Sequence, residues 1–132
     1  MSHIATYAAS LGQVNENLLK QALEIVAKKF GGQVVDSIKD YYGKNLTSWD
    51  GSPITAGIQT PSVKRGIGIT MKNGILQFVG DNYGCENKFS ELRKEIELTY
   101  KKLALAKALK ESGYEIEVAA NAAGTIFQGR RR

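Results

Sequence analysis

Apolar residues recur at helical spacing in two stretches of the chain. The first stretch begins after Asn15, a residue type suited to a helix N-cap, and ends at Gly31-Gly32, where a left-handed backbone is favoured. Its apolar positions fall within one arc of a helix: Leu18, Leu19, Ala22, Leu23, Val26 and Phe30. Charged residues fill the rest of the turn, so the pattern predicts a helix that buries one face.

The second helix is predicted over residues 87–112, before Gly113, and it carries two apolar stripes. One stripe consists of Phe89, Leu92, Ile96, Tyr100 and Leu103. The other lies on the opposite side of the helix and consists of Leu98, Leu105 and Leu109. A helix that only packs on a sheet needs one stripe. The second stripe must therefore meet the segment 43–62, the first helix or another copy of the protein.

Short runs rich in β-branched and aromatic residues predict the strands. Residues 3–10 and 33–42 have this character. The runs 64–72 and 75–79 flank Asn73-Gly74, a dipeptide that suits a two-residue hairpin turn because both positions take a positive φ. These runs predict two strands near the N-terminus and a central β-hairpin.

The last third of the chain predicts one more strand pair. Apolar and glutamate residues alternate over 114–118, a turn-rich stretch follows at 119–124, and 125–128 can pair back as a final strand. The order is then β-α-β-(loop)-β-β-α-β-β. We expect a single α+β domain over 1–132, with a mainly antiparallel sheet and two helices on one face.

Residues 43–62 have no regular pattern and contain both prolines and the only tryptophan. A connection of this length is unusual in a compact domain, so it is either a functional flap or contains short strands that the pattern does not resolve. A ligand site under such a flap would use aromatic and acidic side chains: Trp49, Asp50, Tyr41 and Tyr42.

The charge of the chain is concentrated at its C-terminal end. The 132 residues carry 18 Lys and Arg against 13 Asp and Glu, a net charge of +5. Three of these charges are Arg130, Arg131 and Arg132, in an expected basic tail over 129–132. With Lys64 and Arg65, the tail could give weak, sequence-independent binding of nucleic acid. Glutamates interleave with the lysines of the second helix, which is typical of a solvated face.

The small numbers of cysteine and histidine residues exclude several kinds of functional site. One cysteine, Cys85, excludes an intramolecular disulfide, and Cys85 with the single histidine, His3, cannot supply a Cys/His zinc site. Residues 81–86 lack the ligand spacing of a calcium loop. The Gly66-Ile67-Gly68 pair of glycines lies inside a predicted strand, where a bulge is the ordinary interpretation. We expect no catalytic residue, no metal and no cofactor.

No stretch is long and apolar enough for a membrane span, and no secretory signal pattern begins the chain. We therefore expect a cytoplasmic protein without membrane contact.

Several short motifs resemble a known family. They are Met1-Ser2-His3, Tyr42-Gly43, Gly68-Ile69-Thr70, Asn73-Gly74, Phe78-Val79-Gly80-Asp81, the helix positions Phe89, Leu92 and Tyr100, Gly113-Tyr114-Glu115 and Gly124-Thr125-Ile126. In these motifs the chain is similar to the uncharacterised small-protein family of cyanobacteria and red-algal plastids, a domain of unknown function with scattered relatives. The resemblance implies an α+β fold and a cytoplasmic location, and it implies no catalytic residues. Residues 44–62 and the terminal arginines do not match the family.

Together these observations favour a non-enzymatic interaction module that self-associates or binds a protein partner through Leu98, Leu105 and Leu109. The alternative is weak nucleic-acid binding by the C-terminal arginines. A ligand site under the 43–62 flap is the third hypothesis.

Overall fold

The computed structural model describes residues 4–9, 14–46, 54–72, 75–121 and 124–131, and from 114 onwards it describes the backbone. The helices are α1 (Glu16–Lys29) and α2 (Glu86–Glu111). The strands are β1 (Ile4–Ala8), β2 (Gln33–Val35), β3 (Ala56–Gln59), β4 (Ile67–Lys72), β5 (Ile75–Asp81), β6 (Tyr114–Asn121) and β7 (Gly124–Arg131).

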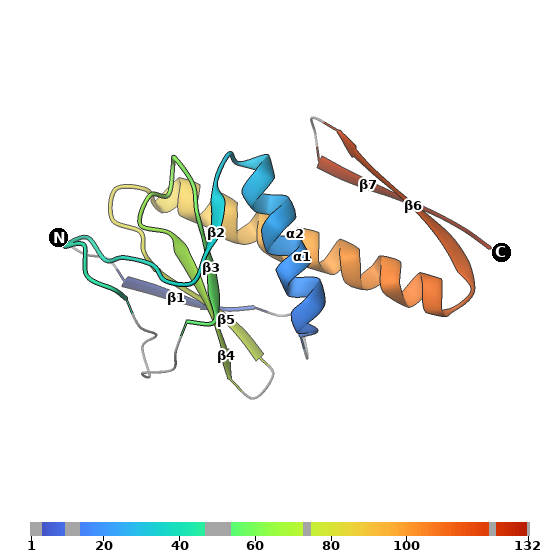
Figure 1. Ribbon diagram of the computed structural model, residues 1–132, viewed down its shortest axis with the longest axis horizontal. Helices are drawn as coiled ribbons and strands as arrows, with labels where there is room; N and C mark the ends of the chain where they lie inside the picture. The colour runs from blue at the N-terminus through green and yellow to red at the C-terminus, as the bar shows by residue number, and fades with distance from the viewer. Residues whose placement is uncertain (1–3, 10–13, 47–53, 73–74, 122–123, 132) are drawn as a thin grey trace.

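The first five strands form an antiparallel sheet in the order β1-β5-β4-β3-β2 (Figure 1). β4 and β5 are joined by a two-residue connection, because Lys72 pairs with Ile75. This confirms the central hairpin, while its turn residues 73–74 lie outside the described residues. The chain has the α+β class that its pattern predicts.

One core joins both helices to one face of the sheet. The sheet contributes Ile58, Ile67, Ile69, Leu76 and Phe78, and α1 contributes Leu19, Ala22, Leu23, Val26 and Ala27. The first half of α2 adds Phe89, Leu92, Ile96 and Tyr100. The predicted buried stripe of each helix is therefore confirmed, and the predicted N-cap is too, because Asn15 Oδ1 accepts the backbone N–H groups of Asn17 and Leu18.

The predicted strand 33–42 is wrong after Val35, where β2 ends. The chain turns there because Ile38 packs over the sheet face opposite the helices. A Cβ added at Gly57, Gly66 or Gly68 would lie within 3.1 Å of the Ile38 side chain. Ile38 is fully buried in the space that these glycines leave. Residues 39–45 then form a loop closed by a single bridge between Lys39 and Asn45.

Part of the irregular segment 43–62 forms a short strand, which is the second of the two interpretations given for this segment. β3 pairs with β2 on one side and β4 on the other and is an internal strand of the sheet. Its central residues Gly57 and Ile58 are both buried, because one faces Ile38 and the other faces the helices. A strand buried on both faces has no alternation of apolar and polar residues.

The last two strands form a separate hairpin at the end of α2. β6 and β7 pair over eight residues each, from Tyr114 opposite Arg131 to Asn121 opposite Gly124. Of the expected basic tail over 129–132, residues 129–131 belong to β7. The register places Arg130 opposite Glu115.

Candidate functional site

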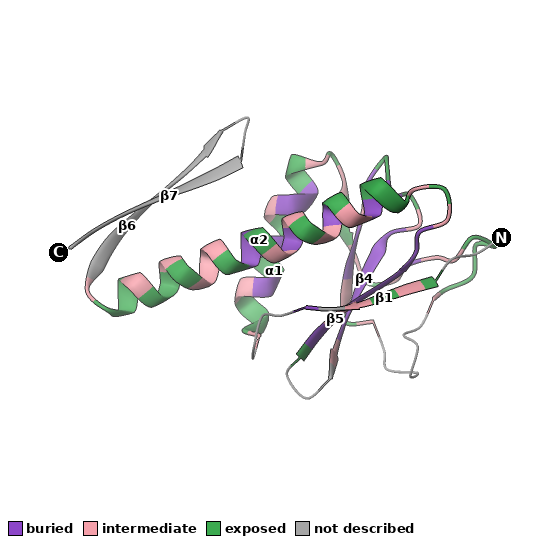
Figure 2. Cartoon of the chain, turned by 180° about the vertical axis from the view of Figure 1, so that it is seen from behind, coloured by how far each residue is buried: buried purple, intermediate pink, exposed green. Residues whose placement is uncertain are grey.

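The two halves of α2 differ in burial. The first half crosses the sheet and contributes its apolar side to the core, whereas the second half extends beyond the sheet (Figure 2). Leu98 is 46% exposed and Leu105 is 57% exposed, while Leu109 is half-buried. We call these three residues the leucine face.

Two of the three possible covers of the leucine face are α1 and the segment that contains β3. α1 packs against α2 from the core side, where Leu92, Ile96 and Tyr100 lie, and it leaves Leu98 and Leu105 open. The described part of the segment 43–62 packs in and against the sheet through β3. In the part of the chain that the structure describes, α1 and the segment 43–62 therefore leave Leu98 and Leu105 exposed.

A second cluster forms where the loop 39–45 meets the turn after β5. Asp81, the last residue of β5, is fully buried. Its two carboxylate oxygens accept the backbone N–H groups of Tyr41, at 2.7 Å, and Tyr83, at 3.2 Å. Arg65 donates to the backbone carbonyls of Asp81, at 3.2 Å, and Tyr83. These bonds hold the loop and the turn side by side.

Three tyrosine rings gather around this junction. The Tyr41 ring meets Tyr42 edge to face, with centroids 5.3 Å apart, and meets Tyr83 in the same way at 5.1 Å. The Arg65 guanidinium carbon lies 5.6 Å from the centroid of Tyr41. Tyr41 is 45% exposed and Tyr42 is 68% exposed. We call these four residues the Arg65–tyrosine surface.

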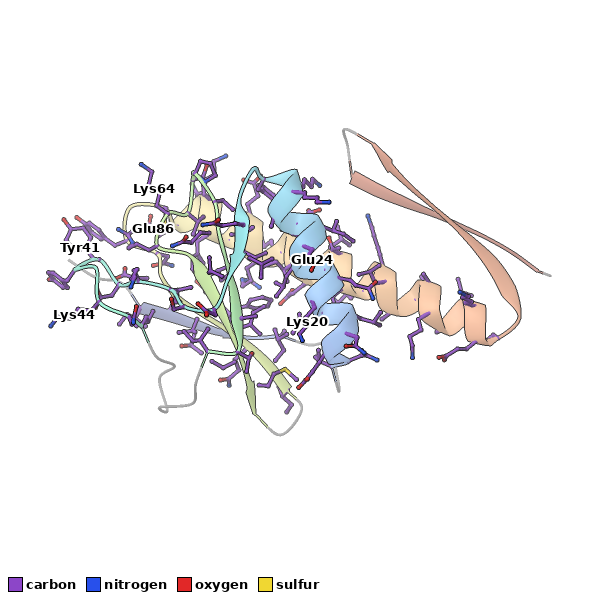
Figure 3. All side chains as sticks on the ribbon, viewed as in Figure 1. Lys20, Glu24, Tyr41, Lys44, Lys64 and Glu86 are labelled. Atoms are coloured by element: carbon purple, nitrogen blue, oxygen red, sulfur yellow. The ribbon has the colours of Figure 1, made fainter. Side chains whose placement is uncertain are left out.

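The basic residues of the nucleic-acid hypothesis do not form one patch. Lys64 and Arg65 precede β4, at the end of the molecule that carries Tyr41 and Lys44 (Figure 3). Arg130 and Arg131 lie at the end of β7, near the C-terminus on the other side of the molecule (Figure 1). Arg132 lies outside the described residues.

The structure describes two of the four residues of the flap hypothesis. Trp49 and Asp50 lie outside the described residues, and Tyr41 and Tyr42 belong to the Arg65–tyrosine surface. An open groove of about 660 Å³ does lie beside the segment, between α1 and the sheet edge formed by β2. Lys20, Glu24, Val34, Asp36 and Thr55 are among its lining residues, and neither tyrosine is.

The remaining candidates have ordinary surroundings. Cys85 is the N-cap residue of α2, and an Arg65 nitrogen lies 3.9 Å from its sulfur. The described residues contain no group of three or more His, Cys, Asp or Glu residues that could hold a metal ion. His3 lies outside the described residues.

The sequence reasoning missed Asp81 as the organiser of a site. Asp81 follows the apolar run Phe78-Val79-Gly80, and a carboxylate at the end of a buried strand is a signal that it is held by hydrogen bonds. Its partner Tyr41 is 40 residues away in the chain, so only the folded structure identifies the pair.

Comparison of the chain with family models, with curated proteins and with solved structures finds no match. Within the described parts of the chain, no helix combines the length and the apolar content that a membrane span requires. The function is therefore argued from the geometry of the two surfaces.

Proposed function

We propose that this chain is a non-enzymatic interaction module that acts in the cytoplasm and associates with a second copy of itself through the leucine face of α2. The observation that carries this proposal is the exposure of Leu98 and Leu105 on a helix whose other side already fills the core. When a partner covers exposed leucines, their apolar surface is removed from water, and this favours association.

The spacing of the leucine face suits one helix as its partner. Leu98, Lys102, Leu105 and Leu109 are separated by four, three and four residues, which is the spacing of a two-helix seam. Such a seam is narrower than the face with which a helix packs on a sheet. The α2 helix of a second copy offers the same seam, and a twofold axis brings the same patch of both copies together.

The expected association is weak. Each of the four half-exposed leucines in a dimer, Leu98 and Leu105 of both copies, would contribute about 1 kcal/mol. Association itself costs about 4 kcal/mol or more, so the rest of the seam must supply the net affinity. We therefore expect a dissociation constant of about 1 μM or weaker.

Sedimentation equilibrium of the full chain across a wide concentration range tests the proposal. The wild type should approach twice the monomer mass of 14.4 kDa as the concentration rises. Leu105→Glu should stay monomeric and keep its thermal stability, because it places a charge in the seam but leaves the core intact. Ile75→Glu is the matched control, since Ile75 is 50% exposed on β5, and it should dimerise as the wild type does.

A wild type that remains monomeric at the highest concentrations would contradict the proposal. In that case a loss of stability in Leu105→Glu would indicate that another part of the same chain covers the leucine face in solution.

A further inference from the structure

The Arg65–tyrosine surface is built by buried groups. Asp81 is fully buried and uses its two oxygens to hold the backbone of Tyr41 and Tyr83. Arg65 is half-buried and is held by two carbonyl groups on the same turn. The tyrosines therefore stand on a fixed backbone, although their rings are open to solvent. A binding surface that is already ordered loses less entropy when its ligand arrives.

The ring geometry leaves the outermost tyrosine available. The Tyr41 ring meets both Tyr42 and Tyr83 edge to face and also has the Arg65 guanidinium over it, so Tyr41 already has three neighbours within the cluster. Tyr42 is the most exposed ring of the group, at 68%. A flat, unpaired base can stack on such a ring, whereas the bases of a duplex are already stacked on each other.

The charges beside the rings favour an anionic ligand. Lys44 and Lys64 are exposed, and among the residues that the structure describes neither ammonium group takes part in an ion pair (Figure 3). Among the described residues, the acidic groups at this end of the molecule include Asp40, Glu86 and the buried Asp81, whose carboxylate is turned to the backbone of Tyr41 and Tyr83. Asp40 Oδ1 accepts the backbone N–H groups of Tyr42 and Lys44, at 2.9 Å each, and is turned to the loop.

We infer that the Arg65–tyrosine surface, with Lys44 and Lys64 beside it, binds single-stranded nucleic acid without sequence preference. The open ring of Tyr42 stacks with a base, and the lysines meet the phosphates. Tyrosine and arginine are also common in protein interfaces, but lysine is depleted from the centres of such interfaces. The site lies apart from the C-terminal arginines and from the leucine face, so it is independent of the proposed self-association.

Fluorescence anisotropy with a labelled oligodeoxythymidylate of about 10 nucleotides measures the binding, since known single-strand sites span about 4–16 nucleotides. The wild type should bind at low salt, and the affinity should fall as salt rises. Tyr42→Ala should weaken binding about tenfold through the loss of one stacked base. Tyr42→Phe keeps the ring and should stay within about twofold of the wild type.

The lysine variants test the phosphate contacts. Lys64→Gln should weaken binding and reduce the slope of log affinity against log salt by about 0.7, the value for one phosphate on a single strand. Lys110→Gln removes the same charge from the last turn of α2, away from this surface, and should leave the affinity unchanged. Because Tyr42 and Lys64 are exposed, circular dichroism should show unchanged folding in each variant.

Three results would overturn the inference. The first is the absence of oligonucleotide binding at low salt, which would leave a protein contact as the use of this surface. The second is equal weakening by Lys64→Gln and Lys110→Gln, which would show a general attraction between charges. The third is binding that survives Tyr42→Ala but is lost when Arg130, Arg131 and Arg132 are all replaced by glutamine, which would assign binding to the C-terminus.

Discussion

Gly80 of β5 lies directly beneath the ring of Phe89, where the sheet meets the first turn of α2. A Cβ added at residue 80 would lie 2.4 Å from Phe89 Cε2 and 3.0 Å from the carbonyl oxygen of Gly66. Ordinary contact begins at 3.4 Å, so the ring would have to move by 3.4 − 2.4 = 1.0 Å. Phe89 is fully buried and packs beside Tyr7, with centroids 6.2 Å apart, so little space receives it.

We therefore expect Gly80→Ala to lower the free energy of unfolding by about 2 kcal/mol, the usual cost of adding a methyl group to a packed core. Phe89→Leu alone should cost about 1–2 kcal/mol through lost burial and a small cavity. The leucine frees the space that the new methyl needs, so the double variant should be more stable than the sum of the single changes by about 1 kcal/mol. Urea unfolding followed by circular dichroism measures all four proteins.

The control is Gly31→Ala, which has no neighbour within 4 Å of the added Cβ and is strained only by its φ of +68°. Its cost should add to that of Phe89→Leu. If Gly80→Ala and Phe89→Leu also add within about 0.3 kcal/mol, residue 80 does not press on the ring and the packing argument fails.

Three further changes probe smaller features. Asn15→Ala removes the N-cap of α1 and should lower the stability by about 1 kcal/mol in thermal unfolding; an unchanged midpoint would contradict the capping bonds. Asp81→Asn leaves one acceptor oxygen for two partly buried N–H groups and should cost about 1–2 kcal/mol, with faster amide hydrogen exchange at both. Full protection would refute the anchoring role. Glu95→Gln breaks a partly exposed ion pair with Lys29, so the free energy of unfolding should fall by less than about 1 kcal/mol, and the difference should vanish in concentrated salt. A loss of stability that does not depend on salt would instead indicate a packing effect.

The elements that the sequence predicted well are those whose evidence is local. Both helices have a buried stripe, and α1 also has an N-cap, within a few turns of the chain. The β4–β5 hairpin follows from one dipeptide between two apolar runs. The strand β3 has no such signal, because Ile38 returns across the sheet and packs at Gly57. That contact depends on tertiary structure, and so does the early end of β2.

The candidate sites also differ in whether a local sequence pattern identifies them. Leu98 and Leu105 could be identified from helical spacing alone, and their exposure in the structure agrees with that analysis. The Arg65–tyrosine surface could not be identified from the spacing of residues along the chain. The sequence placed Arg65 in one hypothesis and Tyr41 in another, since 24 positions separate them. Asp81 brings them together, because its carboxylate accepts the N–H group of Tyr41 and its backbone carbonyl accepts from Arg65. No local pattern shows which backbone groups a carboxylate will hold.

The two proposals together predict a dependence on oligonucleotide length. α2 begins beside the turn that carries Tyr83, and its leucine face lies towards its other end, so a dimer formed through that face would carry two Arg65–tyrosine surfaces away from its centre. A strand long enough to reach both surfaces should bind at least about tenfold more tightly than a short one, because the second contact forms within the complex. Leu105→Glu should abolish this gain and leave the affinity for the short strand unchanged.

Fluorescence anisotropy with strands of about 10 and about 40 nucleotides measures the affinity for each strand, at protein concentrations where the wild type is dimeric. If Leu105→Glu weakens both strands equally, the leucine face contacts the nucleic acid itself, and the separation of the two surfaces is refuted. If the long strand gains nothing in the wild type, the two surfaces of the dimer do not act on one strand.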